Sequence, residues 1–166
     1  MKKHWWKALG VLLVLYTIVL GFTGEVPRLP ILNETIRNLY FHVTMWFAMV
    51  ILMTSSLVYS IKFLRGGDLL ADLKGKELAI TGFFMASLGL LTGAVWAKFT
   101  WGTWWTNDPK LNGTAVTMLI YLAYFVLRGS VDDPQKRGRL SAVYNIFAYV
   151  MMIVFIGILP RLTDSL

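Results

Sequence analysis

The stretch NLYFHVTMWFAMVILMTSSLVYSI, residues 38–61, contains 24 residues and no Lys, Arg, Asp or Glu. Four further stretches are equally free of charge, at residues 8–24, 78–97, 111–127 and 140–160. A helix needs roughly 17–25 apolar residues to cross the hydrocarbon core of a bilayer, where the backbone must pair within a helix or a closed barrel. Because these stretches do not alternate polar and apolar residues as barrel strands do, the sequence predicts an all-α, polytopic membrane helix bundle with five transmembrane helices.

The composition of the 166-residue chain agrees with this fold class. Hydrophobic residues make up 57% and charged residues 15%, whereas soluble domains average roughly 45–50% and about 25%. The mean hydropathy is +0.61. The chain has no cysteine, which excludes a disulfide scaffold and thiolate chemistry. We expect residues 1–166 to form a single membrane domain.

Basic residues are distributed unevenly between the two ends of the predicted helices. Eleven Lys and Arg residues lie at the N-terminus and in the connections 62–77 and 128–139, and five lie on the other side. Cytoplasmic segments are enriched in Lys and Arg, so the sequence predicts a cytoplasmic N-terminus and a C-terminus on the outer side. The basic residues are spread over three segments rather than gathered on one face, which argues against a nucleic-acid partner.

The first predicted span, 8–24, has an alternative interpretation as a cleaved signal peptide. Its apolar run is longer than a usual signal core and Gly21–Gly24 is a poor cleavage site, so we favour a retained anchor. Residues 30–38 repeat apolar side chains at helical spacing, which is typical of a short interfacial helix. Asp68 is a suitable N-cap for another short helix within 62–77.

The outer connection 98–112 is rich in tryptophan. Four of the seven tryptophans of the chain fall within residues 96–105. Tryptophan prefers the membrane interface, so the cluster could be part of an aromatic belt. Alternatively, Trp101, Trp104 and Trp105 around a glycine form a flat apolar platform for a large planar ligand. Composition alone does not separate these interpretations. In the preceding span, Gly89 and Gly93 form a GxxxG pair that favours close packing of another helix.

His42 lies near the outer end of the second span, with Trp46 one helical turn later on the same face. A neutral imidazole is a good ligand for iron or copper. A lone histidine at an interface is more commonly a hydrogen-bonded structural residue, and the residues alone favour that interpretation. The only other histidine, His4, lies in the basic N-terminal segment and has no expected role.

The segment WGTWWTNDPKL, residues 101–111, resembles the tryptophan-rich WWD signature of the haem-handling membrane proteins of cytochrome c biogenesis, in particular CcmC-like proteins. Three other segments resemble the same family: YFHVTMW at 40–46, TGAVWAK at 92–98 and RLSAV at 139–143. The family usually has Trp where Asn107 stands, Arg where Lys110 stands and Thr where Asn112 stands. Lys110 keeps the charge but loses the bidentate guanidinium fork.

This resemblance implies a protein that binds haem b transiently and non-covalently at the outer face of the bacterial cytoplasmic (inner) membrane. The haem would pass to a periplasmic haem chaperone during cytochrome c maturation. The resemblance also implies two other kinds of partner, the subunits of an ABC transporter and a small membrane subunit of the maturation complex. No catalytic constellation is visible, so we expect a haem-transfer protein rather than an ordinary enzyme. The alternatives are an integral b-type cytochrome that transfers electrons, or a small accessory subunit of a transporter.

The resemblance makes His42 an axial ligand of the haem iron. The other predicted haem-binding residues are Trp46, Trp101, Trp104, Trp105, Asp108, Arg37 and Lys110. Cations near the interface would neutralise the haem propionates. Asp108 has two interpretations: it hydrogen-bonds a loop amide or a partner, or it begins the turn before the fourth span together with Pro109.

The family places a second haem-ligating histidine after its fifth span and then adds a sixth span. Residues 160–166 contain no histidine. We therefore expect this chain to be a C-terminally truncated member, with a histidine among the codons that follow Leu166.

Overall fold

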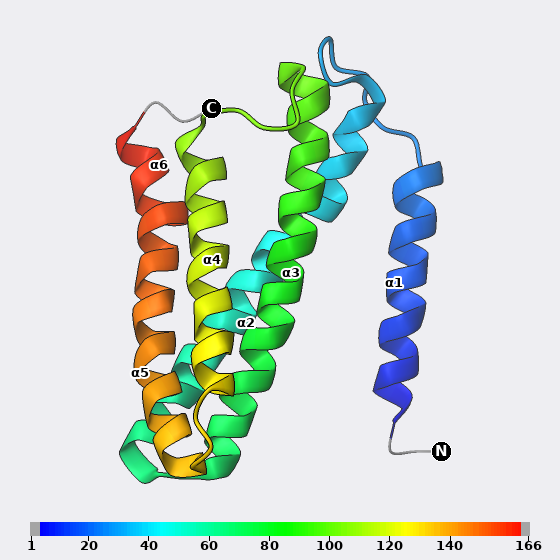
Figure 1. Ribbon diagram of the computed structural model, residues 1–166. Helices are drawn as coiled ribbons and strands as arrows, with labels where there is room; N and C mark the ends of the chain where they lie inside the picture. The colour runs from blue at the N-terminus through cyan, green and yellow to red at the C-terminus, as the bar shows by residue number, and fades with distance from the viewer. Residues whose placement is uncertain (1–3, 164–166) are drawn as a thin grey trace.

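The computed structural model describes residues 4–163, and this part of the chain folds into helices joined by short connections (Figure 1). In chain order they are α1 (Trp5–Thr23), the 3₁₀ helix η1 (Asn33–Arg37), α2 (Asn38–Gly66), α3 (Leu69–Trp101), α4 (Pro109–Gly129), α5 (Pro134–Met152), the π-helix η2 (Ile153–Ile158) and α6 (Leu159–Leu162). Within residues 4–163, five helical segments are long and apolar enough to cross a membrane, because η1 continues into α2 and α5 continues through η2 into α6. This confirms the predicted number of spans, and the chain is a multi-pass membrane protein.

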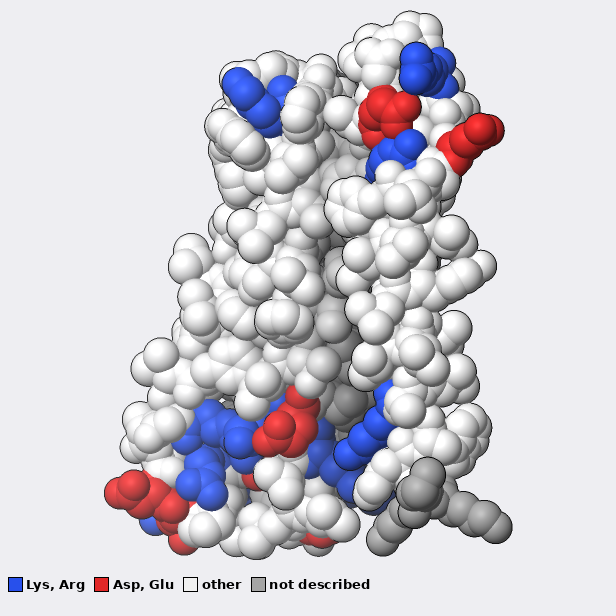
Figure 2. All heavy atoms as spheres, turned by 90° about the vertical axis from the view of Figure 1, so that its right-hand side faces the viewer, with Lys and Arg blue, Asp and Glu red and all other residues white. Residues whose placement is uncertain are grey.

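Charged side chains gather at the two ends of the bundle and leave an uncharged band between them (Figure 2). We call the end that holds the connection 102–108 the tryptophan end. The opposite end holds the connections 67–68 and 130–133 and is called the basic end. The separation expected from the charge-free stretches is therefore present in the folded chain. Which end faces the cytoplasm stays a prediction.

The antiparallel pair of α2 and α3 makes the most extensive contact between helices. Along one face of α3 run small buried residues at spacings of three and four: Ala71, Gly75, Ala79, Gly82, Ala86 and Gly89. A Cβ added at Gly82 would lie 3.0 Å from the sulfur of Met53 on α2. Small residues allow two helices to approach closely, which matters in lipid because burial from water no longer drives their association.

Polar side chains connect the helices toward the basic end. Asn145 of α5 donates to the hydroxyls of Ser56 and Ser60 on α2, each at 2.8 Å, and Ser56 donates to the carbonyl of Gly75 on α3 at 2.7 Å. Arg128 of α4 and Asp72 of α3 form a two-pronged ion pair, with 2.7 Å between Nη1 and Oδ1 and 2.5 Å between Nη2 and Oδ2. These contacts bring four helices together at one end.

Helix α1 stands apart from the other helices along most of its length (Figure 1). Its one buried residue is Gly21, which lies against the ring of Phe41. The rings of Phe22 and Phe41 stack with their centroids 5.2 Å apart. Arg37 donates to the carbonyls of Gly21 and Gly24. The first span is thus held to α2 at the tryptophan end.

Three predicted elements have different bounds in the structure. The interfacial helix expected over 30–38 is the shorter 3₁₀ helix Asn33–Arg37, which runs directly into α2. Asp68 is an N-cap, accepting from the Leu70 amide at 2.9 Å, but it begins the whole of α3 rather than a separate short helix. The connection expected over 98–112 comprises only 102–108, because α3 continues until Gly102 adopts a φ of +80°.

The ion pair of Asp72 and Arg128 gives a stability prediction. Both side chains are only 10% exposed, and removing one partner of a buried pair costs about 3–5 kcal/mol because the other charge is left unpaired. Arg128→Gln should therefore lower the free energy of unfolding in detergent micelles by about 3 kcal/mol. The double variant Asp72→Asn, Arg128→Gln should recover much of this loss. Arg65→Gln, at an exposed position of α2, serves as the control. A double variant as unstable as Arg128→Gln would contradict the prediction.

Candidate functional site

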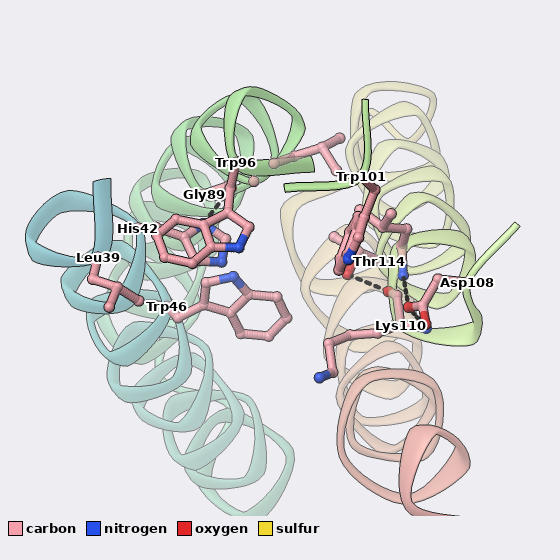
Figure 3. Close-up of a pocket in the computed structure, with 12 residues that line it drawn as sticks. Leu39, His42, Trp46, Gly89, Trp96, Trp101, Asp108, Lys110 and Thr114 are labelled. Atoms are coloured by element: carbon pink, nitrogen blue, oxygen red, sulfur yellow. Dashed lines mark hydrogen bonds between the residues drawn. The ribbon is translucent and has the colours of Figure 1, made fainter. Parts of the chain in front are cut away.

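A cavity of about 300 Å³ opens between α2, α3 and α4 at the tryptophan end. One wall comes from α2 and α3 and includes Leu39, His42, Trp46, Gly89, Gly93 and Trp96. The opposite wall consists of the α4 residues Lys110, Leu111 and Thr114 and of Asp108, which precedes α4, with Trp101 beside them. Figure 3 shows the two walls facing each other across the cavity. Three of the tryptophan side chains and a single imidazole therefore surround one largely apolar space.

His42 is held by a hydrogen bond to the facing helix. Its Nδ1 atom lies 3.0 Å from the carbonyl oxygen of Gly89 and 3.1 Å from the hydroxyl oxygen of Thr92. A carbonyl oxygen can only accept, so Nδ1 carries the proton of the neutral ring. The other ring nitrogen, Nε2, then keeps its lone pair. This is the tautomer that can bind a metal through Nε2.

The glycine pair of α3 accommodates the two rings of α2 that line the cavity. A Cβ at Gly93 would lie 3.0 Å from Cε1 of His42, and a Cβ at Gly89 would lie 3.6 Å from the indole ring of Trp46. The centroids of the His42 and Trp46 rings are 6.3 Å apart. The GxxxG pair therefore packs against α2. The side chains that lie against its two glycines are the imidazole of His42 and the indole of Trp46.

The tryptophans that the sequence grouped together have different surroundings. Trp101, the last residue of α3, lines the cavity, whereas Trp104 and Trp105 are absent from its lining. Trp104 is 59% exposed and Trp105 is 43% exposed. The structure thus does not bring the predicted three-ring platform together at the cavity. Trp96, which was not among the predicted site residues, lines it instead.

Trp105 is part of a hydrogen-bonded chain in the connection 102–108. Its indole Nε1 donates to Oδ1 of Asn112 at 3.1 Å, and Nδ2 of Asn112 donates to Oδ1 of Asn107 at 2.7 Å. Lys98 closes the start of the connection by donating to the carbonyl of Gly102 at 2.9 Å. The connection is therefore held by side-chain bonds at both of its ends.

Asp108 begins α4. Its Oδ1 atom accepts from the amides of Lys110 at 2.8 Å and Leu111 at 3.3 Å, so it caps the helix N-terminus. Pro109 occupies the first helical position, where its missing N–H costs nothing. This geometry favours the interpretation of Asp108 as the start of the fourth span. The residue is 4% exposed and also contributes to the cavity lining.

The two predicted cationic residues lie in different places. Lys110 lines the cavity, and its side chain extends into the space between the walls (Figure 3). Arg37 is absent from the cavity lining. Its Nε atom donates to Glu34 at 2.8 Å and its Nη1 atom to the carbonyls of Gly21 and Gly24. Arg37 therefore joins α1 to α2 in this structure, and Lys110 is the cation at the cavity.

Two residues of the site were missed by sequence reasoning. Thr92 and Trp96 lie one turn apart on α3; Thr92 directly precedes Gly93 of the glycine pair, and Trp96 follows it. Their spacing from Gly89 places them on the face that meets α2. The spacing could have indicated these two residues, but only with the knowledge that this face of α3 packs against α2.

Comparison with known proteins agrees with the resemblance. The family described as Heme exporter protein C (CcmC) matches residues 2–157. Heme exporter protein C of Rhodobacter capsulatus is 29% identical over 150 residues, which are 90% of this chain and 62% of that protein. Heme exporter protein C of Paracoccus denitrificans is 31% identical over 111 residues, 67% of this chain and 46% of that protein. Cytochrome c biogenesis protein CcsA of Prochlorococcus marinus is 35% identical over 105 residues, 63% of this chain and 32% of that protein.

The chain thus spans less than two thirds of the length of these relatives. The family match covers nearly all of the chain, including the three helices that form the cavity. The chain belongs to the Heme exporter protein C (CcmC) family.

Proposed function

We propose that this chain binds haem b in the cavity at the tryptophan end and hands it to a periplasmic haem chaperone during cytochrome c maturation. The observation that carries the proposal is the hydrogen bond from His42 Nδ1 to the Gly89 carbonyl, because it leaves Nε2 able to bind iron. A porphyrin supplies four of the iron ligands itself, so one well-placed imidazole is a useful contribution from the protein. The names of the relatives support the same role.

The surroundings of His42 fit a haem as the transported substrate. The indole rings of Trp46, Trp96 and Trp101 offer apolar faces to a planar macrocycle. Lys110 supplies a cation for a propionate. At about 300 Å³ the cavity is at the lower end of the usual range for ligand pockets. It would enclose part of the macrocycle, while the remaining edge extends past the connection 102–108 toward the outer face.

The same proposal assigns the two ends of the bundle. The tryptophan end faces the periplasm and the basic end faces the cytoplasm of a bacterial inner membrane, in line with the enrichment of cytoplasmic segments in Lys and Arg. The ABC transporter subunits and the small membrane subunit of the maturation complex are the proposed partners. The inner connections within 62–77 and 128–139 are the regions available to the transporter.

Replacing the proposed iron ligand tests the function directly. His42→Ala should reduce the haem that co-purifies with the chain by more than about tenfold, the minimum expected when even an outer-shell group of a metal site is lost. Cytochrome c assembly in cells should fall with it. His4→Ala, at an exposed position of the basic end, is the matched control and should keep both. Unchanged haem occupancy and assembly in His42→Ala would remove His42 from the site, and a stable two-histidine spectrum of the purified chain would favour a b-type cytochrome.

The glycine under the imidazole gives a second test. Gly93→Ala puts a methyl group 3.0 Å from the His42 ring, so the ring must move and haem affinity should fall by about tenfold. Haem titration followed at the Soret band measures this. Gly10→Ala, in α1 with no atom near the added methyl group, should bind as the native chain does. Equal affinities for the two alanine variants would contradict the proposed position of the iron.

The role of Lys110 can be separated from general packing with a chemically altered haem. Lys110→Gln should weaken haem binding by about fivefold, or about 1 kcal/mol, because a charge-assisted contact to a propionate is lost. Lys110→Arg should retain the affinity. Haem dimethyl ester, which has no carboxylate charge, should bind equally to the native chain and to Lys110→Gln. An equal loss for haem and for its ester would show that Lys110 acts through packing alone.

A further inference from the structure

The hydroxyl of Thr92 contacts three acceptor or donor groups at the α2–α3 boundary. It lies 2.8 Å from the carbonyl oxygen of Leu88, 3.0 Å from that of Gly89 and 3.1 Å from Nδ1 of His42. A threonine hydroxyl has one proton and two lone pairs, and in a helix it commonly donates to the carbonyl four residues earlier. With its proton on Leu88, the oxygen accepts from His42. Thr92 and the Gly89 carbonyl then share the Nδ1–H proton.

Helix α2 meets Thr92 at two successive turns. Nδ2 of Asn38 donates to the Thr92 carbonyl at 2.7 Å, and His42, four residues later, contacts the Thr92 hydroxyl. Gly93 lies against the same imidazole. The ring is therefore restrained by two acceptors at Nδ1 and by the α3 backbone beside Cε1. Rotation of the imidazole about the Cβ–Cγ bond would lose both acceptors of Nδ1.

We propose that Thr92 is a positioning residue that fixes the tautomer and orientation of His42 and strengthens Nε2 as an iron ligand. This role rests on the proposed function. The Gly89 carbonyl is a backbone group that any residue type would provide. The Thr92 hydroxyl, in contrast, is present only because residue 92 is a threonine. Acceptance of the Nδ1–H proton raises the electron density of the imidazole, which makes Nε2 a stronger ligand. A stronger donor favours ferric over ferrous iron and lowers the reduction potential of the bound haem.

Three threonine variants test the role of Thr92 in the haem-loaded chain. Thr92→Val keeps the shape of the side chain but cannot accept a hydrogen bond. It should lower haem affinity by about tenfold and raise the reduction potential, and Thr92→Ser should restore both. Thr81→Val is the matched control, because the Thr81 hydroxyl bonds only the Glu77 carbonyl of its own helix at 2.8 Å. Native affinity and potential in Thr92→Val would overturn the proposal.

A measurement without haem separates this role from the proposed function. In a His4→Ala background with a histidine-free affinity tag, His42 is the only histidine, and ¹⁵N NMR reports which ring nitrogen carries the proton. The neutral ring should be protonated at Nδ1 alone, whereas Thr92→Val should populate the Nε2–H tautomer as well. A ring protonated at Nε2 in the native chain, or one unaffected by Thr92→Val, would overturn the positioning role. Failure of the native chain to bind haem, with the expected tautomer present, would overturn only the proposed function.

Discussion

The close approach of α2 to α3 is the constraint on which the rest of the structure depends. In a bilayer the lipid tails are as apolar as the side chains, so helices associate through close packing and polar contacts rather than through burial from water. The face of α3 that meets α2 supplies small residues from Ala71 to Gly93, and α2 supplies the large ones. These small residues of α3 therefore leave room for Met53 in the middle of the bundle and for Trp46 and His42 at the tryptophan end. Moving this contact would move the candidate site with it.

The bundle is joined differently at its two ends. At the basic end, Asn145 links α5 to α2 and the pair of Asp72 and Arg128 links α3 to α4, so polar bonds draw four helices together. At the tryptophan end the corresponding space between α2, α3 and α4 holds the cavity. There α4 is instead packed against η2, where a Cβ at Gly113 would meet the carbonyl oxygen of Phe155 at 2.5 Å. Polar bonds therefore fix the helix positions at the basic end, while the cavity lined by His42 lies at the tryptophan end.

Much of the fold followed from the sequence, because burying a charged side chain in lipid costs free energy. Stretches without charge therefore identify the spans. The helix ends were less predictable, since a helix continues past the hydrocarbon until local geometry stops it. Gly67 and Gly102, with φ values of +68° and +80°, end α2 and α3 well beyond the charge-free stretches. At the cavity, His42 and Lys110 were named from the sequence and its family resemblance and do line the space, whereas Thr92, which contacts His42, was not named. Its role depends on which face of α3 meets α2, and that is a property of the packed pair rather than of either helix.

Residues 107 and 112, where the chain departs from the pattern usual in the resembling family, are linked in the structure. Asn112 accepts from the indole of Trp105 and donates to Asn107, so the two asparagines act as one unit that holds the connection 102–108. Each asparagine amide offers a donor and an acceptor on separate atoms. A tryptophan at position 107 has no acceptor, and a threonine hydroxyl at position 112 has to donate and accept through one oxygen. The bonds tie the indole ring of Trp105 to the first turn of α4. An ordered connection beside the cavity has less conformational freedom to lose when a ligand binds. The two asparagines therefore limit the conformational freedom of the connection 102–108 next to the cavity.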